Sequence, residues 1–249
     1  MTWFFLLSVG ALILLMKLAA MGVRGLTART SLSFWLSPLP SPSSLDRCAD
    51  RSRLLGRLVW SAVSALALAL GYRVYWDVVV PRELPPWILG YLGIPFLLLL
   101  SSLFWGVLTL VWLPTGRLHP ALHRRPWLAR SVADFWGHRW NLWFSDWFRY
   151  VVLVPLRRRP ALAVVVVFLL SGLIHEWVVN FSLYLAADQR RFGTMMLYFP
   201  LQAAGLLIER RFMGGRRLAK VAWAWLVVVL PSPWVLNEGL LRALRLWPY

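Results

Sequence analysis

The stretch PALAVVVVFLLSGLIHEWVVNFSLYLAA, residues 160–187, decides the fold because it is almost entirely apolar yet carries His175 and Glu176 at its middle. A helix rises about 1.5 Å per residue, so a helix of this length can cross the roughly 30 Å hydrocarbon core of a bilayer. Ionisable side chains inside such a span cost about 2.5 to 3.5 kcal/mol each on insertion scales. We therefore expect this pair to have a structural partner or a chemical role.

The polar residues of this span follow a helical pattern. Ser171 precedes His175 by four residues and Ser182 follows it by seven, which places the three side chains on one helix face. Glu176 points about 100° away from that face. Adjacent helix positions do not face each other, so a direct bond between His175 and Glu176 is not expected. We expect Glu176 to pair with an arginine or to stay protonated, and the stripe to face a cavity or another helix.

The composition is that of a membrane protein. Hydrophobic residues make up 59% of the chain, against about 45 to 50% in soluble domains. The formal net charge of +17 comes from short basic clusters between apolar segments, which favours contact with anionic lipid and disfavours a nucleic-acid partner. The single cysteine, Cys48, cannot form a disulfide framework, and the sequence shows no cluster of metal ligands.

Apolar segments along the chain predict an all-α polytopic membrane protein, with about six transmembrane helices and one interfacial amphipathic helix in a single domain, 1–249. Pro95 should kink the third span, Lys17 should reach toward the headgroups, and Pro231 and Pro233 should end the last span before a short amphipathic tail. The expected spans are residues 2–20, 58–76, 87–113, 160–187, 192–208 and 218–236.

The distribution of basic residues predicts an orientation. If six spans alternate, most arginines fall on one side, which the positive-inside rule assigns to the cytosol. The long polar connection, residues 114–159, then faces the cytosol and both termini lie on the other side. Arginine greatly outnumbers lysine, which indicates a GC-rich genome and favours a bacterial inner membrane, or the endoplasmic reticulum membrane if the source is eukaryotic.

The segment WLARSVADFWGHRWNLWFSDWFRY, residues 127–150, has helical periodicity. One predicted face carries Asp134, His138, Asn141 and Ser145. A second face carries Trp136, Trp140, Trp143 and Trp147. This pattern is typical of a helix in the membrane interface, where indole rings settle at headgroup level. The simplest interpretation is an anchor whose polar face is solvated.

Two motifs give this region a family resemblance. FWGHRWN, from Phe135 to Asn141, followed by SGLIHE, from Ser171 to Glu176, resembles the wax synthase branch of the membrane-bound O-acyltransferases. There, an FWGRRWN-like motif precedes an SGxxHE-like motif. The first motif also looks like the FYxDWWN motif of diacylglycerol and sterol acyltransferases. The resemblance covers the motif core, residues 127–187, and family members are usually longer.

The resemblance implies ester formation from acyl-CoA and a lipophilic alcohol, with acyl-CoA as co-substrate and no other cofactor. Histidine suits a general base because its reference pKa is about 6.5. By resemblance, His175 is the base and Asn141 assists, by positioning the thioester or binding the developing oxyanion. Further candidates for contact with acyl-CoA or the acceptor are Trp136, Arg139, Trp140, Ser171 and Glu176. Arg139 and the arginines at 124, 125 and 157–159 either bind coenzyme A phosphates or simply flank the membrane.

Several alternatives remain open at this stage. A long-chain alcohol is the favoured acceptor, but related enzymes acylate terpenoid or polyketide natural products. A proton-coupled transporter could use buried His175 and Glu176, although no inverted repeat supports it. A scaffold in which the tryptophan segment is only an anchor is a third class. A zinc protease of the HExxH kind is excluded because Val179 stands where the second histidine is needed. The oligomeric state is not determined.

Overall fold

The computed structural model describes residues 2–24, 35, 37–39, 54–115, 118–181, 184 and 193–248. All regular elements within these ranges are helical, in agreement with the predicted all-α class. The α-helices are α1 (Thr2–Arg24), α4 (Leu54–Val74), α5 (Pro86–Trp112), α6 (Val132–Asp134), α7 (Leu142–Phe148), α8 (Pro160–His175), α10 (Thr194–Phe212), α11 (Arg217–Val228) and α12 (Glu238–Ala243).

Three helical segments in the described residues are long and apolar enough to cross a membrane: Leu54–Arg82, Pro86–Trp112 and Pro160–Phe181. A shorter apolar helix covers Leu7–Val23. The protein is thus an all-α membrane protein, but the expected count of six spans is not reached in the part that the structure describes. The expected span at 218–236 is wrong, because α11 ends at Val228 and a 3-10 turn, Ser232–Trp234, follows. The proline residues around that turn explain its early end.

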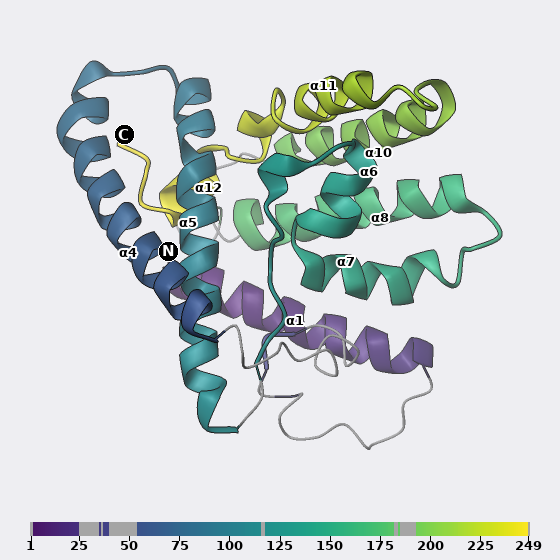
Figure 1. The fold of residues 1–249 in the computed structure, drawn as a ribbon, viewed down its shortest axis with the longest axis horizontal. Helices are drawn as coiled ribbons and strands as arrows, with labels where there is room; N and C mark the ends of the chain where they lie inside the picture. The colour runs from purple at the N-terminus through teal and green to yellow at the C-terminus, as the bar shows by residue number, and fades with distance from the viewer. Residues whose placement is uncertain are drawn as a thin grey trace.

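Figure 1 shows two groups of helices. α4 and α5 form a long pair, while α1, α7, α8, α10 and α11 run across the view beside it. The helices are therefore not one parallel set, so the orientation derived from alternating spans stays a prediction. Gly106 allows α4 and α5 to approach closely, since a Cβ atom there would lie 1.9 Å from the Ser61 Oγ. α5 continues as one helix through Pro95.

The C-terminal segment packs against the α4–α5 pair. Leu241 and Leu246 are fully buried there. The hydroxyl groups of Tyr72 and Tyr75, in and directly after α4, donate to the carbonyl groups of Leu244 and Leu246. The segment predicted to be an amphipathic tail is therefore part of a core.

Lys17 does not reach toward a headgroup layer. Its side chain is 2% exposed, and Nζ donates to the carbonyl oxygens of Trp35, at 2.9 Å, and Ser37, at 2.6 Å. The predicted snorkelling is wrong because backbone carbonyls inside the protein satisfy the ammonium group.

The tryptophan segment is not one helix. It contains α6, a π-helical turn Phe135–Arg139, a break at Trp140 and Asn141, and then α7. Asn141 has a φ of 40° and a ψ of 62°, a left-handed conformation that ends the helical repeat.

Its indole groups are used inside the protein. The Nε1 atoms of Trp136, Trp143 and Trp147 donate to Gln202 Oε1, the Pro120 carbonyl and the Met16 carbonyl. Trp143 is 4% exposed and Trp147 is 6% exposed. The predicted row of interfacial tryptophans is therefore wrong for this segment.

Candidate active site

The candidate site is built where α8 packs on α10. Phe168 of α8 and Phe199 and Ala203 of α10 belong to one buried core, which also includes Val132 of α6. Gly172 keeps the two helices close, because a Cβ atom there would lie 2.7 Å from the Met196 Sδ. The helical contact thus brings SGLIHE and the start of FWGHRWN onto the same core.

His175 is the last residue of α8 before the backbone becomes π-helical over Glu176–Phe181. Its Nδ1 lies 2.7 Å from the Ser171 carbonyl oxygen, and its ring centroid lies 4.5 Å from that of Phe199. A carbonyl oxygen only accepts, so this contact requires the proton on Nδ1 and leaves the lone pair on Nε2. No hydrogen-bond partner of Nε2 is found among the described residues. Ser171 acts here through its main chain.

Glu176 has a different set of partners from its neighbour. Its Oε1 accepts hydrogen bonds from the backbone N–H groups of Gly193, Met195 and Met196, at 2.9, 3.0 and 3.3 Å. Its Oε2 accepts from Asn180 Nδ2 at 2.6 Å. A carboxylate at a helix N-terminus satisfies unpaired amides and is favoured by the helix dipole. Glu176 therefore holds the start of α10, without the arginine expected from the sequence.

Asn141 is held by its backbone. Its N–H donates to His123 Nδ1 at 3.0 Å, and its carbonyl accepts from the N–H of Ser145 at 3.0 Å. Burial lowers the pKa of His123 to about 4, which keeps the accepting nitrogen unprotonated. The Asn141 side-chain Oδ1 is buried and has no hydrogen-bond partner in the described part of the chain. A buried acceptor without a donor is costly and marks a place where a ligand can supply one.

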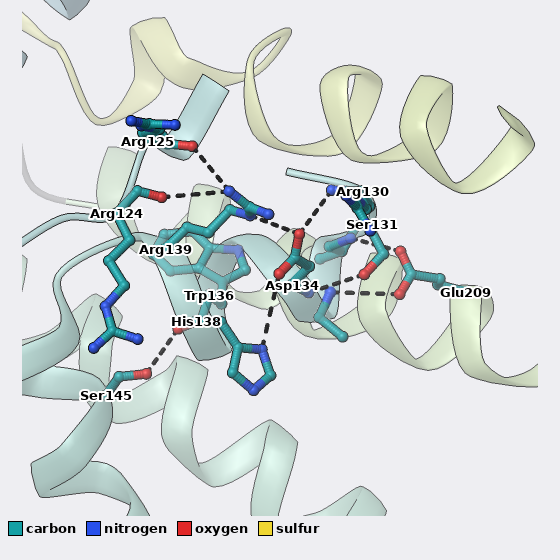
Figure 2. Close-up of polar contacts among 12 residues, drawn as sticks. Arg124, Arg125, Arg130, Ser131, Asp134, Trp136, His138, Arg139, Ser145 and Glu209 are labelled. Atoms are coloured by element: carbon teal, nitrogen blue, oxygen red, sulfur yellow. Dashed lines mark hydrogen bonds and ion pairs between the residues drawn. The ribbon is translucent and has the colours of Figure 1, made fainter. Parts of the chain in front are cut away.

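The other residues of the first motif mostly contact protein. Trp140 stacks on Phe135, with ring centroids 5.6 Å apart. Arg139 Nε lies 2.6 Å from Asp134 Oδ2. Arg139 Nη1 also contacts two backbone carbonyls, those of Arg124 and Arg125 (Figure 2). Arg139 thus ties the motif to the preceding loop and is already engaged, in contrast to the free cation expected for a phosphate contact.

The motif residues are connected indirectly. His175 and Trp136 both pack on Phe199, with centroids 4.5 and 6.2 Å from it. No hydrogen bond joins His175 to Asn141 in the described residues. Ser182, the third member of the expected polar stripe, lies outside the described residues.

A cavity is lined by residues of α5, α10, α11 and the segment that leads to α12. It has a volume of about 730 Å³ and is lined mainly by apolar and aromatic side chains, among them Trp87, Tyr91, Leu201, Trp223 and Trp234. Neither His175 nor Asn141 lines it. A polar chain connects the two regions: Asn237 Nδ2 donates to Thr194 Oγ1 at 2.8 Å and to Asn180 Oδ1 at 3.1 Å, and Asn180 donates to Glu176.

Sequence reasoning missed several of these residues. His123, Phe199, Asn180 and Asn237 lie outside the two motifs. Their roles come from contacts between distant segments. Asn180 alone had a usable signal, because a polar residue four positions after Glu176 shares its helix face.

Comparison with known proteins identifies this region. Residues 119–201 match the membrane bound O-acyl transferase family. The resemblance read from the two motifs is confirmed. The match includes both motifs, the left-handed turn at Asn141 and the first part of α10.

Similar proteins from two plants are named long-chain-alcohol O-fatty-acyltransferases. The long-chain-alcohol O-fatty-acyltransferase of Simmondsia chinensis is 31% identical over 141 residues, which cover 50% of this chain and 39% of that protein. A probable long-chain-alcohol O-fatty-acyltransferase of Arabidopsis thaliana is 35% identical over 102 residues, or 37% of this chain and 29% of the relative. The chain thus covers less than half of these relatives. No solved structure matches it significantly. The plant relatives give no support to a bacterial inner membrane.

Proposed function

We propose that the protein transfers an acyl group from acyl-CoA to the hydroxyl group of a long-chain alcohol. The observation that carries the proposal is the geometry of His175, whose Nδ1 is fixed by the Ser171 carbonyl and whose Nε2 has no partner in the described residues. Support comes from the family match over both motifs and from the names of the plant relatives.

The proposed reaction needs one base and one oxyanion partner. His175 Nε2 takes the hydroxyl proton as the alcohol oxygen attacks the thioester carbonyl carbon. The tetrahedral intermediate then breaks its carbon–sulfur bond, and the imidazolium returns the proton to the coenzyme A thiolate. The Nδ1–H bond to Ser171 keeps the ring in one tautomer throughout. We propose that Asn141 assists with its side-chain amide: the Nδ2–H group donates to the oxyanion of the tetrahedral intermediate, and the buried Oδ1 can accept a hydrogen bond from the substrate.

We assign the large cavity to the lipophilic substrate. Its volume of about 730 Å³ and its apolar lining suit an alkyl chain. Thr194 and Asn237 form its polar end, and the bonds through Asn180 lead to Glu176, next to His175. A transporter that moves protons through Glu176 is less well supported, because four hydrogen bonds already occupy its carboxylate.

The test is acyl transfer by purified protein in nanodiscs, with labelled palmitoyl-CoA and hexadecanol. His175→Ala should lower turnover about a hundredfold or more while thermal unfolding stays unchanged, because general base catalysis contributes about that much. His138→Ala is the matched control, since the His138 side chain is 78% exposed. Wild-type turnover in His175→Ala contradicts the assignment. A panel that adds terpenoid and polyketide alcohols decides the acceptor class.

A further inference from the structure

A second, smaller cavity lies where the loop before α6 meets the turn between α10 and α11. Its volume is about 360 Å³, and its lining is Arg130, Ser131, Gly215, Arg217 and Lys220. Three of these five residues are cations, and they come from two segments far apart in the sequence. None of the three cationic side chains has a carboxylate partner in the part of the chain that the structure describes. The cavity therefore concentrates positive charge.

The backbone around this cavity is fixed from both sides. Glu209, which is 3% exposed, accepts hydrogen bonds from the N–H groups of Val132, at 2.6 Å, and Ala133, at 3.4 Å (Figure 2). This carboxylate joins the loop to the last turns of α10 and is directed at amides. On the other side, Gly215 has a φ of 72°, a conformation that glycine adopts without strain and that brings Arg217 to the start of α11.

We infer that this cavity binds a phosphate group of a ligand. Arginine presents paired N–H donors that match phosphate oxygens, and lysine adds a compact charge. The N-terminus of α11 adds to this field, because Arg216 makes no side-chain cap there, although the N–H group of Arg217 itself donates to the Gly215 carbonyl. Two sources share this chemistry: the coenzyme A phosphates of acyl-CoA, and the headgroup of an anionic lipid. The first source rests on the proposed function.

The position of the cavity relative to His175 suits a long ligand. Phe199, which packs on the His175 ring, and Glu209, which holds the cavity loop, are ten residues apart on α10. This separation corresponds to about 15 Å along the helix. Acyl-CoA has a pantetheine arm between its thioester and its phosphates, so one molecule can place a phosphate in the cavity and its thioester toward His175.

The experiment compares two triple variants with equal loss of charge. Arg130→Gln/Arg217→Gln/Lys220→Gln removes the cavity cations, and Arg210→Gln/Arg211→Gln/Arg216→Gln removes three exposed arginines around the same turn. Equilibrium binding of palmitoyl-CoA, 3′-dephospho-palmitoyl-CoA and palmitoyl-pantetheine is measured in phosphatidylcholine nanodiscs. A parallel arm measures thermal stabilisation when phosphatidylglycerol is added. Arg217→Lys keeps the charge and tests the paired donors.

If coenzyme A supplies the phosphate, the cavity variant weakens palmitoyl-CoA binding about tenfold or more relative to the control and leaves palmitoyl-pantetheine binding unchanged. If a lipid supplies it, only the stabilisation by phosphatidylglycerol is lost. Equal behaviour of the two triple variants in both arms overturns the inference. Because binding is measured without turnover, failure of the proposed ester synthesis leaves a positive binding result intact.

Discussion

The α8–α10 pair and the α4–α5 pair are both close helix contacts, yet they are stabilised differently. The α8–α10 contact combines an apolar core with polar bonds from Glu176, directly after α8, to the backbone N–H groups of Met195 and Met196 in α10. The α4–α5 contact relies on shape, with Gly106 against Ser61, and its outer faces carry exposed apolar side chains such as Leu66 and Val111. Polar bonds across helices fix geometry, whereas exposed apolar faces suit lipid. The candidate site therefore lies on the α8–α10 pair, where polar bonds fix the relative position of the two helices.

The largest expected effect comes from removing the Glu176 carboxylate from the α8–α10 contact. Glu176→Ala leaves three backbone N–H groups and the Asn180 amide without their acceptor. We expect the free energy of unfolding to fall by about 3 kcal/mol, since unsatisfied buried donors cost about 1 to 3 kcal/mol each and water reaches some of them. Thermal unfolding in nanodiscs measures the loss. Glu238→Ala, which breaks a carboxylate bond to Arg242 in α12, is the comparison variant.

If Glu176→Ala unfolds at the wild-type temperature, the carboxylate does not hold α10, and its place beside the proposed base needs a functional explanation. If stability falls while turnover per folded molecule is kept, Glu176 is a structural residue. Only the second outcome separates Glu176 from His175, whose replacement should affect turnover alone.

The corresponding test of the α4–α5 pair adds a side chain at Gly106, where the two helices approach most closely. Gly106→Val should lower the free energy of unfolding by about 2 kcal/mol, because overpacking forces Ser61 and the α4 backbone to move. Turnover per folded molecule should stay at the wild-type level, because Gly106 lies about 22 Å along α5 from Tyr91, which lines the proposed substrate cavity. The double variant Gly106→Ala/Ser61→Gly should recover part of the stability. Wild-type stability of Gly106→Val contradicts the close contact.

The two motifs differ in how well the sequence predicts them. The α8 segment was predictable, because length, hydropathy and the position of His175 follow directly from helical spacing. The segment 127–150 was not, although its periodicity is equally clear. Its predicted single helix is broken by the left-handed Asn141. Hydrogen bonds that Asn141 and Trp136 donate to His123 Nδ1 and Gln202 Oε1 fix the broken form. Periodicity reports one local repeat and contains no information about such partners.

The hydrogen-bond partners of Glu176 could not be predicted from the sequence either. The sequence predicts that Glu176 pairs with an arginine or stays protonated, because an unpaired charge within a span is costly. The observed partners are backbone amides at the start of α10, seventeen and more residues later in the chain. Backbone donors leave no signature in the residue types, so only the structure reveals them.

The smallest expected effect is a change of stability with pH, which arises at His123 beside the broken segment 127–150. Burial lowers the pKa of His123 to about 4, below the usual value of about 6.5 in an unfolded chain. Between these values the unfolded chain binds a proton that the folded protein does not, so stability falls as the pH falls from about 6.5 toward 4. Protonation also removes the Nδ1 acceptor of the Asn141 N–H. We expect His123 to contribute a loss of about 1.8 kcal/mol between pH 7 and pH 5.

This pH dependence can be measured by thermal unfolding of wild type and His123→Gln. His123→Gln should show a smaller loss on acidification, because glutamine does not titrate, while His138→Gln, altered at an exposed ring, should follow wild type. Burial and the nearby Arg57 lower the pKa of His119 to about 4 as well, so part of the loss remains in His123→Gln. An unchanged pH profile in His123→Gln contradicts the neutral acceptor at Asn141. If the pH profile of His123→Gln flattens and its turnover also falls, His123 positions Asn141. It then also fixes the FWGHRWN motif, which is the less predictable of the two motifs.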